Sequence, residues 1–314
     1  MGDLPQAQRD VSSLLREAYE RFRVGGFEQA TQELEKALAI DYERSEVLNA
    51  LKCANYWDDK VGRYKTITGD YEKGEYLLRQ WKSFIGFLNG SEDEFEQGLF
   101  ATKQWVFGEA LTHFLALLQG HAASDPEILH RVGRCYKGKG DYQQAVEYFE
   151  ACSHQRTDDP QILAELADCY ALINEEKAAK AFFREAFFLD PQAVDVETFD
   201  SLLIQRLIER VGEFGYEKSS LVEWIPVYGV VFGVFNIKRE LRSLELGKLK
   251  QSIFAIESRL EDGEEDHQLE PRLINRYFWL IDHHISSGDS REKVDEILVK
   301  LKNLNKEIYE QYVH

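Results

Sequence analysis

The sequence predicts an all-α fold, organised as a stack of helical hairpins with further helices after it. Three observations predict it. In part of the 314-residue chain, similar residues recur at a constant sequence spacing, which is the spacing between Leu129 and Leu163. Apolar residues recur at the i, i+3, i+4, i+7 spacing of one helix face, and only six prolines interrupt the chain. No stretch shows the sustained alternation of apolar and polar residues that is typical of a half-buried strand.

The repeat is clearest in two consecutive segments within residues 126–192, which share a pattern of small, aliphatic and aromatic positions. The matched pairs, all separated by the same step, are Leu129 and Leu163, Val132 and Leu166, Gly133 and Ala167, Tyr136 and Tyr170, Ala145 and Ala179, and Phe149 and Phe183. An Asp-Pro pair opens each segment, at 125–126 and at 159–160. Small residues let two helices cross closely, and the aromatic rings fill the space between hairpins.

This pattern resembles that of the tetratricopeptide repeat (TPR) family, whose unit is a pair of antiparallel helices in about 34 residues. The resemblance covers residues 11–192, with weaker copies around Gly98–Phe114 and Ala18–Leu38. Gly69–Gly74 marks another turn and second helix, whose first helix is expected to be extended, over 45–66. The resemblance implies a right-handed TPR-like superhelical solenoid of four to five hairpins over 11–192.

After Pro191 the pattern stops, and residues 193–314 are predicted to form a C-terminal helical domain. Helical periodicity predicts helices at 195–212, 240–260, 272–286 and 290–312, and the acidic stretch 261–270 is expected to be an exposed linker.

One segment of this domain, residues 224–237, carries no charged residue and is rich in aromatic side chains. Its aromatic residues are Trp224, Tyr228, Phe232 and Phe235. It is shorter than the roughly 20 apolar residues that cross a bilayer. The first interpretation is that it caps the exposed apolar end of the solenoid. It could also fill the groove as a built-in ligand, or dock to a membrane or partner, since Lys238 and Arg239 follow it directly.

Catalytic and metal-binding patterns are absent from the sequence: it has no His-Glu-x-x-His, phosphate-binding glycine loop or nucleophile elbow. No enzymatic activity, cofactor or metal is therefore predicted. His283 and His284 follow Asp282, but neighbouring helical residues point about 100° apart, so the two rings are not expected to share an ion. The cysteines Cys135, Cys152 and Cys169 are interpreted as core residues.

Composition limits the classes of partner. The chain has 38 Lys and Arg against 56 Asp and Glu, a net charge of −18, and phosphate contacts need a basic face. No nucleic-acid partner is therefore predicted.

Four cysteines do not make a disulfide framework. The first ten residues lack the basic and apolar regions of a secretory signal, which predicts a cytoplasmic location, with a removed leader and a periplasmic location left open.

The resemblance also implies where a ligand binds, because the first helix of each repeat lines a concave surface that holds peptides in this family. On the clearest repeat, His130, Arg134 and Lys137 form a cationic strip at i, i+4 and i+7. On an acidic chain this strip predicts an acidic peptide or a C-terminal carboxylate as its ligand, although a solvated face with no ligand is the alternative. Further inner-face candidates are Glu127, Asp168, Phe95, Leu99 and Lys103.

Together these features predict a non-catalytic scaffold or adaptor that binds a peptide segment or partner helix in a concave groove. The alternative is a TPR component of a cell-envelope or transport complex, docked to a membrane or membrane protein through 224–237. A third hypothesis is a helical enzyme or small-ligand pocket between the solenoid and the C-terminal domain. Self-association through the exposed ends of the stack is left open.

Overall fold

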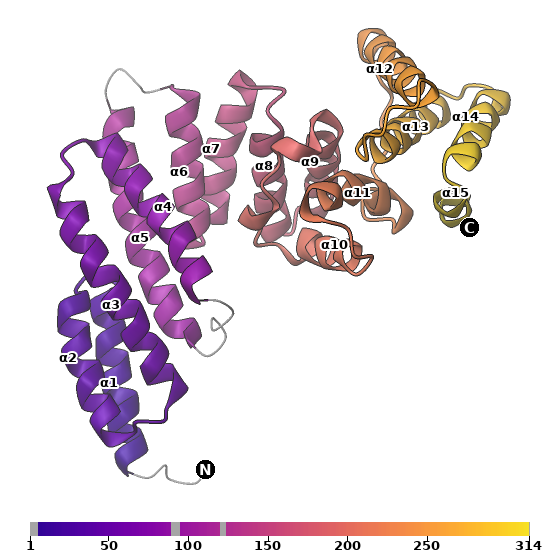
Figure 1. The fold of residues 1–314 in the computed structure, drawn as a ribbon. Helices are drawn as coiled ribbons and strands as arrows, with labels where there is room; N and C mark the ends of the chain where they lie inside the picture. The colour runs from indigo at the N-terminus through magenta and orange to yellow at the C-terminus, as the bar shows by residue number, and fades with distance from the viewer. Residues whose placement is uncertain (1–5, 89–94, 120–123, 314) are drawn as a thin grey trace. The chain divides into compact units, whose positions relative to one another are not determined.

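The computed structural model describes residues 6–88, 95–119 and 124–313. These residues form fifteen α-helices and two short 3-10 helices, and no strand occurs among them. Consecutive helices pack in pairs (Figure 1), so the predicted all-α, hairpin-based fold class is confirmed. The chain divides into two compact units, residues 1–148 and 149–314. This boundary lies inside a helix of the repeat region, whereas the sequence pattern places it at 192/193.

Unit 1 consists mainly of long helices. In order they are α1 (Gln6–Phe22), α2 (Phe27–Ile40), α3 (Ser45–Thr66), α4 (Asp70–Leu88), α5 (Glu96–Leu118), α6 (Pro126–Lys139) and the first half of α7 (Tyr142–Gln155). Helix α3 has the extended length expected for 45–66. The core is aromatic: the Trp57 ring lies 6.1 Å from Phe27 and 5.6 Å from Trp105, measured between ring centroids. Such clusters bury large apolar areas and dominate the stability of helical packing.

The small positions of the pattern coincide with close helix packing. At Gly74, on α4, an added Cβ atom would collide with the Phe114 ring on α5. The Phe114 ring is fully buried. Glycine at this position therefore lets α4 and α5 approach, and a larger residue would displace the ring.

The two clearest repeats have the same local structure at their turns. Tyr136 stacks on Tyr148 with centroids 5.4 Å apart, and one repeat later Tyr170 stacks on Phe182 at 5.6 Å. The first turn reaches a left-handed conformation at Gly140 (φ 86°) and the second at Asn174 (φ 64°), where glycine and asparagine are the residues best tolerated.

The Asp-Pro pairs open the first helix of each repeat. Asp125 accepts a hydrogen bond from the backbone N–H of Glu127, and Asp159 accepts one from Gln161 and one from Ile162. Proline then occupies the first helical turn, where its missing N–H costs nothing. The sequence pattern therefore reflects N-terminal capping as well as core packing.

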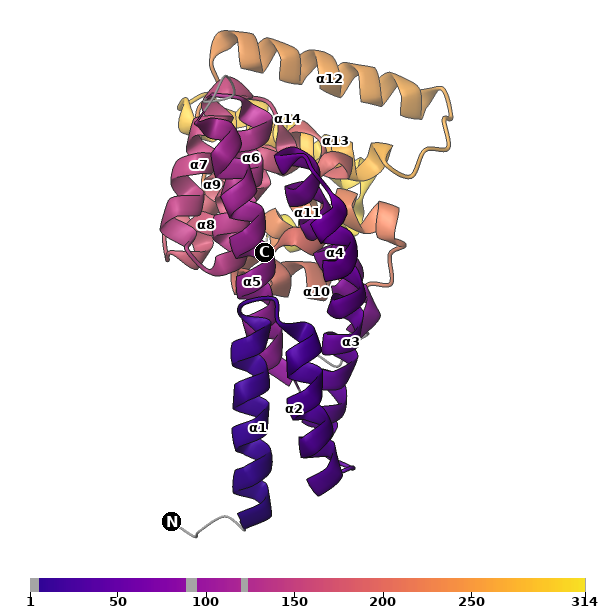
Figure 2. The same cartoon turned by 90° about the vertical axis from the view of Figure 1, so that its left-hand side faces the viewer.

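Unit 2 begins in α7 and contains the second clear repeat together with the C-terminal helices. Its elements are α8 (Pro160–Leu172), α9 (Glu176–Leu189), η2 (Pro191–Ala193), η3 (Val196–Thr198), α10 (Leu202–Gly212), α11 (Lys218–Val231), α12 (Ser243–Glu261), α13 (Leu269–Ser286), α14 (Arg291–Leu304) and α15 (Lys306–Val313). Figure 2 shows α12 along its full length. Leu249, Ile253 and Ile256 form its buried face.

Two of the predicted C-terminal helices are interrupted in the structure. The helix expected over 195–212 starts only at Leu202, because Asp195 accepts the N–H of Glu197 and opens the short η3 turn instead. The helix expected over 290–312 breaks at Asn305, whose backbone is extended and whose side chain accepts the N–H of Ile308 at 2.9 Å. Local bonds from Asp and Asn side chains compete with helix continuation at both points.

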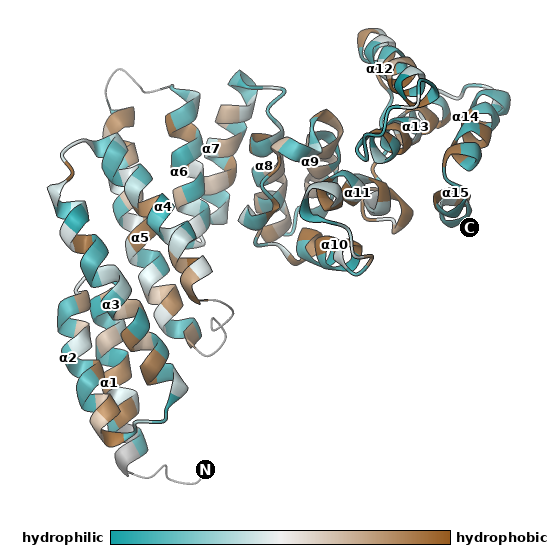
Figure 3. Cartoon of the chain, in the orientation of Figure 1, coloured by the Kyte–Doolittle hydropathy of each residue, from teal (hydrophilic) through white to brown (hydrophobic). Residues whose placement is uncertain are grey.

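The apolar run 224–237 lies in the core of unit 2. It forms the second half of α11 and the turn after it, and Figure 3 shows the hydropathy of this region. Trp224, Tyr228 and Phe235 are 7%, 4% and 1% exposed. The Phe235 ring folds back onto Gly229, where an added Cβ atom would overlap the ring. Phe232 is half-buried.

A buried ion pair joins α9 to α13 in this unit. Arg184 and Asp282, separated by 98 positions in the chain, are bonded and almost fully buried. Arg184 also donates to the carbonyl of Ile237 at 2.6 Å, and its guanidinium lies 4.7 Å from the centre of the Trp279 ring. Lys238 reaches the second carboxylate oxygen of Asp282 at 3.2 Å. These interactions hold the segment that follows α11 against both α9 and α13.

Candidate functional site

The cationic strip predicted on α6 is only partly accessible. His130 and Lys137 are 6% and 5% exposed, while Arg134 is half-buried. Glu127, one turn before the strip, pairs with Arg131 at 2.7 Å. Arg134 is therefore the most accessible residue of the strip.

The inner-face candidates on α5 have different environments. Phe95 is 1% exposed and its ring lies 5.9 Å from that of Tyr19, so it belongs to the core of unit 1 rather than to an open surface. Leu99 and Lys103, one and two turns further along α5, are half-buried. If Phe95 lined a groove, its large apolar ring would be exposed to solvent. Its burial in the core accounts for a phenylalanine at this position.

On α8, the corresponding inner face is covered by the chain itself. Asp168 is fully buried, and its two carboxylate oxygens accept the backbone N–H groups of Asp200 and Ser201 at 2.9 and 3.0 Å. Two turns earlier, the Gln161 side-chain oxygen accepts the N–H of Asp195 at 2.6 Å. Residues 194–201, which we call the covering segment, thus lie along α8. The predicted ligand-binding role of Asp168 is replaced by an intramolecular one.

Beyond the covering segment an apolar pocket remains open. Its volume is about 550 Å³, and it lies between the α8–α9 turn, α10 and the turn after α11. Its aliphatic and aromatic walls are Leu172, Leu202, Leu203, Leu207, Phe232 and Val234. Arg206 and Arg210, one helical turn apart on α10, also line it.

The aromatic residues of the 224–237 run provide little exposed surface for docking, because three of the four rings are buried in unit 2. Among the described helices, none combines the length and the apolar character needed to cross a bilayer. Phe232 contributes to the pocket instead, with the Arg210 guanidinium 3.8 Å from the centre of its ring.

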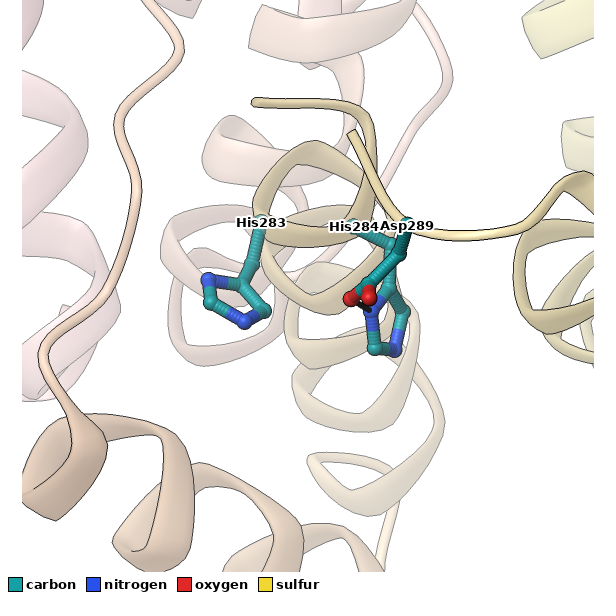
Figure 4. A group of neighbouring side chains, drawn as sticks. All are labelled: His283, His284 and Asp289. Atoms are coloured by element: carbon teal, nitrogen blue, oxygen red, sulfur yellow. Dashed lines mark hydrogen bonds and ion pairs between the residues drawn. The ribbon is translucent and has the colours of Figure 1, made fainter. Parts of the chain in front are cut away.

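His283, His284 and Asp289 place potential metal ligands within 4.8 Å of one another. Figure 4 shows His284 facing Asp289, with Nδ1 and Oδ2 2.7 Å apart. His283 Nδ1, however, accepts the backbone N–H of Leu241 at 3.1 Å. Burial and the neighbouring His284 lower the pKa of His283. The neutral ring must then carry its proton on Nε2, which leaves no lone pair for a metal ion.

All four cysteines are buried thiols. Burial raises the pKa of Cys53 and of Cys135, so neither forms the reactive thiolate readily. We expect the folded chain to react with a disulfide reagent at pH 8 at least about a hundredfold more slowly than the same chain in urea, because reaction requires local opening. The rate at which thiolate is released from the reagent measures this difference, and glutathione serves as the reference thiol. Immediate reaction of any thiol in the native chain would contradict it.

Sequence reasoning missed both the covering segment and the two pocket arginines. The signal for the arginines was present: Arg206 and Arg210 stand at i and i+4 in a helix whose other face carries Ile204, Leu207 and Val211. No local signal identifies the partner of Asp168, because the bonded backbone lies more than thirty residues away.

Comparison with known proteins agrees with the internal repeat. A search of the curated proteins found no match to the chain. Residues 136–198 match the family model described as a tetratricopeptide repeat. This range runs from the end of α6 through α7, α8 and α9 to η3, and so includes the turn geometry that recurs from one repeat to the next. Residues 136–198 are therefore similar in sequence to a tetratricopeptide repeat, and their paired helices agree with that similarity.

Proposed function

We propose that the chain is a non-catalytic scaffold that holds a segment of a partner protein on the inner faces of its repeat helices. Tetratricopeptide repeats indicate protein–protein interaction in general terms. The observation that supports this specific proposal is the covering segment, in which an inner-face carboxylate and amide on α8 bind three backbone N–H groups of residues 195–201. A surface that holds its own chain in this way has the chemistry to hold another.

The repeat step relates this bound face to α6. Glu127 and Arg134 occupy the positions that correspond, one repeat earlier, to Gln161 and Asp168. Where the position on α8 carries Asp168, which accepts two backbone N–H groups, the position on α6 carries Arg134, whose planar guanidinium is a group that pairs with carboxylates and backbone carbonyls. The exchange of an acid for a base at the equivalent position favours a partner segment that carries acidic residues.

A peptide-binding measurement tests this proposal. The full chain is titrated against fluorescein-labelled acidic peptides, and affinity is followed by fluorescence polarisation. We expect Arg134→Glu to weaken binding about tenfold or more, since it converts an attraction into a repulsion. Affinity should also fall as salt rises from low to physiological concentration.

Arg291→Glu is the matched control, because Arg291 is 92% exposed and lies on α14, outside the repeats. Circular dichroism confirms that each variant is folded. If no acidic peptide binds the wild-type chain, or if both charge reversals have equal effects, the inner-face proposal is wrong.

A further inference from the structure

The pocket beside α10 combines an apolar wall with cationic side chains. Leu202 is 63% exposed on its rim, while Leu207 is buried behind it. Arg206 and Arg210 are both exposed. An apolar surface with convergent polar groups at its edge is the general form of a recognition site.

Neither arginine is neutralised by the protein. In the described part of the chain, Arg206 and Arg210 form no ion pair with an acidic residue, and the polar contact recorded for them is the stacking of Arg210 on Phe232 at 3.8 Å. On a chain of net charge −18, two exposed arginines one helical turn apart form a local cationic patch. They attract anions and repel cationic ligands.

The two acidic residues of the pocket lie on other elements. Glu176, at the start of α9, pairs with Lys180 at 3.5 Å. Asp200 belongs to the covering segment and is anchored to Asp168 through its backbone N–H. These carboxylates disfavour an anionic group on their side of the pocket. The charge distribution therefore orients an anionic ligand toward α10.

We propose that this pocket binds an acidic segment of a partner protein, with side-chain carboxylates on Arg206 and Arg210 and a neighbouring large apolar side chain against Leu202 and Phe232. Guanidinium groups bind carboxylates in bidentate fashion, and the apolar wall adds the burial that a charge contact alone lacks. This inference deepens the proposed scaffold function and rests on it. It places specificity on α10, which follows the family-matched residues 136–198.

The test uses the full chain and a panel of fluorescein-labelled octapeptides, capped at both ends, in which two glutamates and one phenylalanine take every relative spacing. We expect at least one peptide to bind, and the double variant Arg206→Gln/Arg210→Gln to raise its Kd about tenfold or more. Replacing the glutamates of that peptide with glutamine should have a similar effect. Leu202→Ser should weaken binding without loss of helicity, because the side chain is exposed.

Arg291→Gln serves as the control for loss of one positive charge far from the pocket. Unchanged affinity in the double variant overturns the inference. If peptides bind and Arg134→Glu alone weakens them, the scaffold proposal stands and the pocket assignment fails. If no peptide of either set binds the wild-type chain, both fail.

Discussion

Replacing Asp282 with alanine is expected to destabilise unit 2 by about 3–5 kcal/mol, because it leaves the Arg184 guanidinium buried without its counter-ion. Arg184 is 3% exposed and Asp282 is 4% exposed. The carbonyl of Ile237 and the Trp279 ring remain as partners of the guanidinium, but neither neutralises its charge. Lys238 loses its partner too, yet its side chain is 45% exposed and can be solvated.

Hydrogen exchange at the amides of α9 and α13, followed as urea is raised, measures this effect within unit 2. The double variant Arg184→Met/Asp282→Leu should recover much of the lost stability, because apolar side chains of similar volume remove the unpaired charge. Glu310→Ala is the control: it removes an exposed pair with Lys306 and should cost less than about 0.5 kcal/mol. Equal effects of Asp282→Ala and Glu310→Ala would show that the buried pair contributes no more than a surface one.

Replacing Asp168 with alanine is expected to cost about 2–4 kcal/mol and to release the covering segment from α8, because one buried and one part-buried backbone N–H group lose a charged acceptor. These are the N–H groups of Asp200 and Ser201. Each such loss costs about 1–3 kcal/mol when water cannot replace the acceptor. Their location just before α10 adds to the effect, because a carboxylate at a helix N-terminus also interacts favourably with the helix dipole.

Hydrogen exchange separates the local from the global consequence. The amides of Asp200 and Ser201 should exchange much faster in Asp168→Ala, while those in the middle of α13 keep their protection if the unit stays folded. Asp168→Asn keeps one carbonyl oxygen and should have a smaller effect. Asp158→Ala removes an exposed carboxylate in the turn before α8 and should leave the same amides protected. Protection that is unchanged in Asp168→Ala would contradict the role given to this carboxylate.

The sequence was sufficient to predict the fold class and the geometry of the best repeats. Leu129, Tyr136, Ala145 and their counterparts in the next repeat carry a periodic pattern that depends only on neighbours within one hairpin. The extended helix α3 was predictable for a similar reason, since the turn residues on either side of it fix its length. Local information of this kind is present in the order of residues.

The arrangement of unit 2 depends on contacts that the sequence pattern does not contain. Arg184 and Asp282 meet across 98 positions, and Asp168 binds backbone N–H groups that any residue type would offer. Periodicity assigned Asp168 to an open surface because it correctly identified the helix face. It could not show that residues 194–201 occupy that face. The pocket arginines were likewise visible as a helical pair, but the wall opposite them is built from three separate elements.

The covered face of α8 bears on how these repeats could be reused in protein engineering. Ala164, Ala167 and Leu163 share one core with Phe199 and Ile204, so a fragment that stops at residue 192 would expose an apolar face and strand the Asp168 carboxylate. Grafting the 160–189 hairpin onto another scaffold would require transplanting the following dozen residues as well. A transferable fragment of this chain must therefore extend to the start of α10, beyond the last recognisable repeat residue.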